Sequence, residues 1–151
     1  MSARYSRRQF LAASVIGAGG FWIGSSPAFA KPRKLSPNEK LDIGVIGVAN
    51  RGGDDLAGVA SQNIVALCDV DDKFLAGAAK KFPSAKTYSD FRELLDQKGI
   101  DAVVIATPDH THAVATTMAL KTGRHVYCEK PLTHTVSECR RVASWRKRKS
   151  W

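Results

Sequence analysis

The sequence contains little cysteine, which excludes several classes of small domain. Among its 151 residues are only 3 Cys, an odd number that does not fit a framework of paired disulfides. Cys68, Cys128 and Cys139 also lack the close spacing of a zinc site. His110 and His112 stand two positions apart, so their side chains would diverge on a helix. We therefore expect buried thiols and no metal centre.

Acidic residues are absent from both ends of the chain, although the whole chain has a formal charge of +9. Residues 1–34 and 140–151 each contain six Lys and Arg and no Asp or Glu. Residues 35–139 contain 11 basic residues and all 14 acidic ones, so the central part is mildly acidic. A nucleic-acid-binding domain normally carries its basic groups on the folded face. The charge distribution therefore argues against nucleic acid as a partner.

No apolar run is long enough for an ordinary membrane span, and we expect no stable one. The run over residues 11–23 is uncharged, rich in glycine and preceded by three arginines. Residues 27–30, Pro-Ala-Phe-Ala, then supply small side chains at the positions that signal peptidase recognises. We predict a signal peptide over residues 1–30, with an anchoring helix as the alternative. Residues 31–39 are predicted to be a polar linker.

The basic segment of this signal has a recognisable pattern. Residues 6–11 are Ser-Arg-Arg-Gln-Phe-Leu, which resembles the S-R-R-x-F-L pattern of twin-arginine signals, although Ala12 replaces the common Lys. Twin-arginine export carries folded proteins, often with a cofactor already loaded. The resemblance implies the twin-arginine export machinery as a partner, and a periplasmic or other extracytoplasmic location. It also favours a cofactor-binding passenger.

Short apolar runs alternate with amphipathic stretches through residues 40–143. Runs at 41–46, 64–68, 102–106 and 125–128 are typical of buried strands, and residues 86–88 could form a minor strand. Helical spacing follows each run, with Asp109 as the expected cap of a helix to Lys121 and Thr135 and Glu138 as a capping box. This alternation predicts an α/β fold with a doubly wound parallel sheet.

The first predicted strand ends in a glycine-rich turn. Residues 47–52 are Gly-Val-Ala-Asn-Arg-Gly, a G-x-A-x-x-G version of the dinucleotide-binding fingerprint. Gly47 permits the tight turn, and Gly52 lets the following helix pack closely against the strand. The turn, including Asn50 and Arg51, would hold the pyrophosphate, with helix amides facing the phosphates. Ala49 adds a methyl group where the backbone approaches the pyrophosphate, so a looser fit or a displaced loop is expected. An ordinary strand–turn–helix is the alternative.

Two further residues follow predicted strands. Asp69 stands 22 positions after Gly47, where a carboxylate can accept hydrogen bonds from the adenosine ribose and would repel a 2′-phosphate. We therefore expect a Rossmann-type domain that binds NAD, with NADP less favoured. Lys130 follows the last predicted strand, where an ammonium could hydrogen-bond a substrate hydroxyl and take part in its proton transfer. A solvated loop lysine is the alternative for Lys130.

Four motifs occur in the order that they have in one known family. They are the 47–52 turn, Leu-Cys-Asp-Val-Asp at 67–71, Ala-Thr-Pro-Asp-His-Thr-His at 106–112, and Glu-Lys-Pro at 129–131. Over residues 40–143 the sequence resembles the N-terminal domain of the glucose–fructose oxidoreductase, inositol dehydrogenase and MocA family.

The resemblance implies NAD(P)-dependent oxidation or reduction at a hydroxyl carbon of a sugar, cyclitol or similar polyol. It implies that Lys130 contacts substrate near the nicotinamide as a catalytic residue. It also implies a cofactor lining that includes Thr107, Pro108, His112 and Glu129. Two alternatives use the same fold: an NAD-dependent glycosidase that oxidises its sugar transiently, and a non-catalytic nucleotide-binding remnant.

The family's second α/β domain, which supplies most substrate contacts and the oligomer interface, has no counterpart in the sequence. The last predicted helix also runs into residues 144–151, a basic segment without an apolar face. We therefore expect an incomplete Rossmann-type sheet over residues 40–143, in a truncated chain, followed by a disordered or aberrant tail. A homo-oligomer is expected only where the second domain is present.

Overall fold

The computed structural model describes residues 39–148, which form a five-stranded parallel sheet with helices between the strands. The predicted signal peptide and all but the last residue of the linker lie outside the described residues. The strands are β1 (Asp42–Ile46), β2 (Asn63–Cys68), β3 (Lys86–Tyr88), β4 (Ala102–Ile105) and β5 (His125–Cys128). The helices are α2 (Arg51–Gly58), α3 (Asp72–Lys81), α4 (Phe91–Asp96), α5 (Asp109–Lys121) and α6 (Val136–Arg148).

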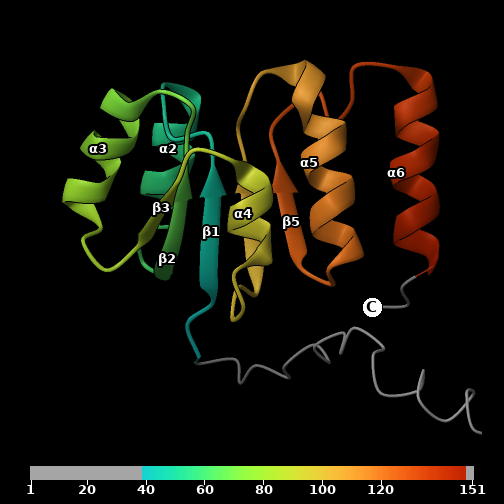
Figure 1. Cartoon of the computed structure of the whole chain (residues 1–151). Coiled ribbons are helices and arrows are strands. Elements are labelled where there is room, and N and C mark those ends of the chain that lie inside the picture. The colour runs from blue at the N-terminus through green and yellow to red at the C-terminus, as the bar shows by residue number, and fades with distance from the viewer. Residues whose placement is uncertain (1–38, 149–151) are drawn as a thin grey trace, which may run out of the picture.

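The strand order is β3-β2-β1-β4-β5, and every neighbouring pair is parallel. The chain therefore moves outward from β1 to β3 and then returns to β4 on the other side of β1. Figure 1 shows the arrowheads of β1 and β5 pointing to the same, upper edge of the sheet. Ligands in open α/β sheets bind at the carboxyl edge where the strand order reverses, which here lies between β1 and β4. The predicted doubly wound parallel sheet is confirmed.

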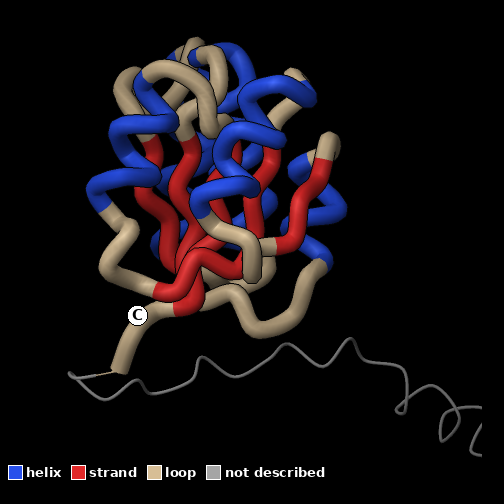
Figure 2. The backbone as a smooth tube through the Cα atoms, turned by 90° about the vertical axis from the view of Figure 1, so that its left-hand side faces the viewer, coloured by secondary structure: helices blue, strands red, loops and turns tan. Residues whose placement is uncertain are grey.

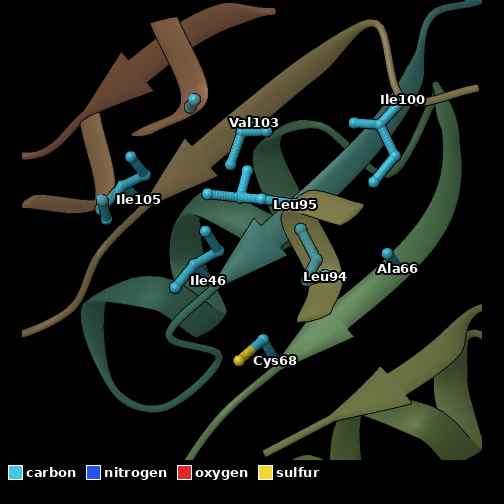
Figure 3. Close-up of a cluster of buried hydrophobic side chains, with 10 residues drawn as sticks. Ile46, Ala66, Cys68, Leu94, Leu95, Ile100, Val103 and Ile105 are labelled. Carbon is cyan, nitrogen blue, oxygen red and sulfur yellow. The ribbon is translucent and has the colours of Figure 1, made fainter. Parts of the chain in front are cut away.

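Two apolar cores lie on opposite faces of the sheet, and helices flank the strands on both sides (Figure 2). On one face, Leu56 of α2 and Leu75 of α3 pack against β1, β2 and β4. On the other face, Leu94 and Leu95 of α4 lie among the buried residues of β1, β2 and β4 (Figure 3). Burial on both faces explains why these strands appear in the sequence as continuous apolar runs.

Side-chain caps fix where several helices begin. Asp71 and Asp90 accept hydrogen bonds from backbone amides two residues on, at the starts of α3 and α4. The Glu138 carboxylate accepts from the Thr135 amide at 2.8 Å, which confirms the capping box of α6. The prediction that Asp109 caps α5 is wrong. Pro108 occupies the capping position with φ −56°, and Asp109 is the first helical residue.

Helix α6 continues beyond the predicted end of the domain at residue 143 and reaches Arg148. It lies beside α5 in Figure 1 and contacts it. The Lys121 ammonium of α5 lies 4.9 Å from the ring centroid of Trp145. A cation–π contact of this kind anchors a segment that has no apolar stripe of its own. Residues 144–148 are therefore helical, in contrast to the disordered or aberrant tail that the sequence suggested.

The prediction of three buried thiols is correct for Cys68, whereas Cys128 is half-buried and Cys139 is exposed. Burial raises the pKa of the Cys68 thiol to about 12, so this sulfur stays protonated at physiological pH. Cys139 lies on an exposed side of α6, whereas Val142 of the same helix is buried. Within residues 39–148, no three His, Cys, Asp or Glu gather in a metal-binding arrangement.

Candidate cofactor-binding site

The turn between β1 and α2 has no room for side chains at its two glycines. Gly47 has φ +85°, a left-handed conformation, and a Cβ there would lie 2.7 Å from the Ala106 carbonyl oxygen. A Cβ on Gly52 would overlap the Gly47 carbonyl oxygen. Asn50 has φ +47° and precedes α2, and its carbonyl accepts from the Gly53 amide at 2.9 Å. The Gly52 amide likewise donates to the Ala49 carbonyl at 2.8 Å, so the turn and the start of α2 form one close-packed unit at the end of β1.

Asp69 ties the end of β2 to this turn. Its Oδ2 accepts from the Val48 amide at 2.9 Å and its Oδ1 accepts from the Asp71 amide at 3.0 Å. Each carboxylate oxygen can accept a second hydrogen bond, so both remain available to ribose hydroxyls. These contacts place Asp69 beside the glycine turn.

A cleft of about 580 Å³ opens at the same edge of the sheet. Its lining comes from the start of α2, the β4–α5 connection and the end of β5, and comprises Arg51, Ala106, Thr107, Asp109, His112, Glu129 and Lys130. Five of these seven residues were predicted from the sequence. Ala106 and Asp109 were in the quoted motif but were not assigned to the site, although they follow the same strand end. The turn of Gly47, Ala49, Asn50 and Gly52 adjoins the cleft through Arg51.

Pro108 does not line this cleft, contrary to the expectation from the family resemblance. It is exposed and forms the N-cap of α5. A proline at the start of a helix lacks an amide that would otherwise need a partner there. Its place in the motif is therefore explained by the start of α5.

His112 lines the cleft, but both of its ring nitrogens face backbone carbonyls. The side chain is 2% exposed, with Nε2 at 2.6 Å from the Thr107 oxygen and Nδ1 at 2.7 Å from the Pro131 oxygen. The ring therefore bridges the β4–α5 connection and the loop that carries Lys130. His112 shapes the cleft through these two loops, a role that sequence reasoning did not assign to it.

Two acidic side chains, Asp55 of α2 and Glu129 after β5, share the guanidinium of Arg51. The Arg51 Nη2 lies 3.0 Å from Glu129 Oε1 and 3.1 Å from Asp55 Oδ1. Tyr127 donates its hydroxyl to Glu129 Oε1 at 3.0 Å. The hydrogen bond from Arg51 lowers the pKa of Glu129, whereas burial is the main cause that raises the pKa of Asp55.

Sequence reasoning missed Asp55 and Tyr127. The signals were present: Asp55 stands four positions after Arg51, on the same helical face. Tyr127 stands two positions before Glu129 on the same side of its strand.

Comparison with known proteins identifies the group to which this arrangement belongs. The profile of an oxidoreductase family with an NAD-binding Rossmann fold, named for Gfo, Idh and MocA, matches residues 13–150. The chain belongs to the Gfo/Idh/MocA oxidoreductase family. Inositol 2-dehydrogenase 1 of Saccharopolyspora erythraea is 36% identical over 107 residues, which are 68% of this chain and 32% of that protein.

Other relatives of this Gfo/Idh/MocA chain differ in their named activities. A glycosyl hydrolase family 109 protein of Solibacter usitatus is 34% identical over 152 aligned residues, covering 89% of this chain and 34% of that protein. The crystal structure of myo-inositol dehydrogenase from Lactobacillus casei, in complex with NAD(H) and myo-inositol, superposes with a TM-score of 0.67 and 31% identity. That match covers 74% of this chain and 34% of the other. The chain thus spans about a third of the length of the relatives that it matches.

The residues at the carboxyl edge fit NAD, the cofactor of this family. The two glycines let the backbone of the turn pack closely, which sets the start of α2 at the edge where Rossmann folds bind a diphosphate, and Asp69 offers acceptors to a ribose. Arg51, at the end of the glycine turn, and Lys130 both line this cleft, so the cleft next to the turn also contains the Lys130 ammonium. The prediction of NAD as cofactor is confirmed. No helix within residues 39–148 combines the length and apolar character needed to cross a membrane.

Proposed function

We propose that this chain is the cofactor-binding part of an NAD-dependent oxidoreductase that acts on a hydroxyl of a sugar, cyclitol or similar polyol. The observation that carries the proposal is Lys130, which lines the cleft at the carboxyl edge together with the end of the glycine turn. The named activities of the inositol dehydrogenase relatives support the same substrate class.

The proposed roles follow from where the side chains stand. Bound NAD supplies a two-electron acceptor. As the neutral amine, Lys130 accepts a hydrogen bond from the reacting hydroxyl of the substrate and takes up its proton as the carbonyl forms. In the reverse direction, the ammonium form returns that proton to the oxygen. His112 and Thr107 hold the loop of Lys130 against the β4–α5 connection, and this contact fixes the ammonium relative to the cleft. Asp69 and the glycine turn bind the remainder of the cofactor.

Lys130→Met is expected to lower turnover by about 100-fold or more, because a general acid–base group typically contributes that much. The affinity for NAD should change little, since methionine fills the same space without the ammonium. The measurement is NADH formation with a panel of inositols, aldoses and polyols, beside direct NAD titration. Lys98→Met, in the exposed turn that follows α4, is the matched control. Unchanged turnover in Lys130→Met would remove this residue from the mechanism.

The same assay separates the remaining possibilities. Accumulation of NADH indicates a dehydrogenase. Hydrolysis of a glycoside without net NADH indicates a glycosidase like the family 109 relative. NAD binding with neither activity indicates a nucleotide-binding remnant.

We also propose that residues 1–30 direct export by the twin-arginine route, which would place the protein in the periplasm or outside the cytoplasm. The Ser-Arg-Arg-Gln-Phe-Leu segment at 6–11 supports this proposal. In a fusion of residues 1–39 to a reporter, replacing Arg7 and Arg8 together by lysine should lower export by roughly tenfold or more. Arg4→Lys should leave export unchanged. Equal export by all three fusions would refute the twin-arginine assignment.

A further inference from the structure

The two carboxylates that share Arg51 are enclosed far more than the arginine itself. The side chain of Asp55 is 6% exposed and that of Glu129 is 13% exposed, whereas that of Arg51 is 61% exposed. One exposed guanidinium therefore forms ion pairs with two enclosed carboxylates. Asp54, on the same helix, is 75% exposed and lies 4.0 Å from Arg51. Asp54 is therefore an exposed neighbour of Arg51 and not one of the two enclosed acids.

Asp55 has an oxygen without a partner. Its Oδ2 is buried and accepts no hydrogen bond within the described part of the chain. A buried, unpaired carboxylate oxygen is costly, and protonation relieves this cost. The side chain lines a small hollow of about 270 Å³ between α2 and the strands β4 and β5, together with Val59, Val104 and Tyr127. Burial and the nearby Glu129 carboxylate both raise the pKa of Asp55, and Arg51 opposes them.

Every charged or titratable group around this pair can be named. Helix α2 contributes Arg51, Asp54 and Asp55, β5 contributes Tyr127, and β4 contributes only the apolar Val104. On the cleft side of Glu129 stand Lys130, Asp109 and His112. Of the two cations, Arg51 is the one that contacts both acids. Arg51 is thus the cation that keeps both acids ionised. If Arg51 leaves, two carboxylates remain together in an enclosed site, and such pairs share a proton.

The same guanidinium stands where the diphosphate of a dinucleotide would bind, so the diphosphate would compete with Asp55 and Glu129 for it. Arg51 is the first residue of α2 and lines the cleft, and the diphosphate of a Rossmann ligand lies at that helix N-terminus. Guanidinium groups bind phosphates through paired, charge-assisted hydrogen bonds. Because Arg51 is largely exposed, its side chain can turn toward the diphosphate without rearranging the core.

We propose that NAD binding draws Arg51 from the Asp55–Glu129 pair to the cofactor diphosphate, and that the acid pair takes up one proton from solvent in exchange. This inference rests on the assignment of NAD to the cleft and assigns Asp55 a role as the positioning residue for Arg51. No covalent bond of the cofactor changes. One proton moves from water to a carboxylate.

The direction of the pH effect follows from this exchange. The pair binds protons more tightly in the complex than in the free protein. NAD affinity therefore falls as pH rises from the pKa of the pair in the free protein to its higher pKa in the complex. Outside that window the affinity is independent of pH. One proton per NAD corresponds to at most about a tenfold loss of affinity per pH unit.

Isothermal titration of the full chain with NAD, in buffers of different ionisation enthalpy, counts the protons taken up. The pH should be scanned from about 4.5 to 7.5, above the ordinary range of a carboxyl group. We expect uptake approaching one proton at some pH in this range, and none for Asp55→Asn, which still binds NAD. Asp54→Asn, one position earlier on the same helix, should keep the wild-type uptake.

Binding without proton uptake at any pH in the range, or equal uptake by wild type and Asp55→Asn, would overturn the exchange. A chain that does not bind NAD would instead overturn the cofactor assignment, so the two failures are distinguishable. If Asp55→Asn does not fold, the carboxyl carbon of Asp55 in ¹³C-labelled wild type serves the same purpose. Its NMR titration should shift to higher pH on saturation with NAD, and an unmoved titration of both acids would refute the proposal.

Discussion

Gly52→Ala is expected to abolish NAD binding and to lower the free energy of unfolding by about 3 kcal/mol or more, at the upper end for overpacked sites. The added Cβ would overlap the carbonyl oxygen of Gly47, a backbone atom that cannot turn aside. The steric clash can be removed only if the first turn of α2 moves away from the sheet. That movement also displaces the helix N-terminus, where the diphosphate binds.

Gly58→Ala is the matched control, because it makes the same change on the same helix. Nothing lies within 4 Å of a Cβ at Gly58. Alanine there should leave NAD affinity unchanged and raise stability by roughly 0.5 kcal/mol, through the lower entropy of the unfolded chain. Thermal melts and NAD titration of both variants check the pair. Wild-type binding by Gly52→Ala would show that the turn is looser than the structure indicates.

Asp69→Asn is expected to reverse much of the preference for NAD over NADP. Asparagine keeps an acceptor for the Val48 amide but loses the negative charge that faces the ribose. The affinity for NAD should fall by about tenfold or more, because a hydrogen bond to a charged acceptor contributes roughly 1.5–3 kcal/mol. The affinity for NADP should rise, because the repulsion of its 2′-phosphate is removed.

The measurement is the ratio of the dissociation constants for NADP and NAD in wild type and variant. Asp72→Asn, which removes the same charge from an exposed position nearby, should leave the ratio unchanged. A ratio that stays the same in Asp69→Asn would show that the ribose does not contact this carboxylate.

The sequence predicted the strands well because local and global signals agree there. The central strands β1, β2 and β4 are buried on both faces, so their apolar runs are continuous. The edge strand His125–Cys128 also has the predicted bounds. The predicted end of the helix at Lys121 also agrees with the structure, whereas its start lies one residue earlier than predicted. The glycine turn and Asp69 were recognisable because their spacing follows from one strand–turn–helix unit.

The parts that were missed depend on contacts between distant segments. The hydrogen bond from Arg51 to Glu129 joins residues 78 positions apart, so its geometry is set by the order of the strands. The contact between His112 and the Pro131 carbonyl likewise requires the Lys130 loop to pack against α5. The end of α6 was misjudged because Trp145 contacts Lys121 of another helix through a cation–π interaction, which leaves no periodic apolar pattern in the sequence.

The most direct test of the account is a titration of the ¹⁵N-labelled chain with NAD, followed through its backbone amides. The account predicts shifts concentrated at residues 47–53, 69–71, 106–112 and 129–131, along the carboxyl edge of the sheet. A second hollow, of about 350 Å³, is lined by Asp42, Gln62, Asn63 and their neighbours near the opposite end of the strands. Amides there should not move. Shifts centred on that second hollow, or no shifts at saturating NAD, would contradict the assignment of the cofactor to the cleft at Lys130.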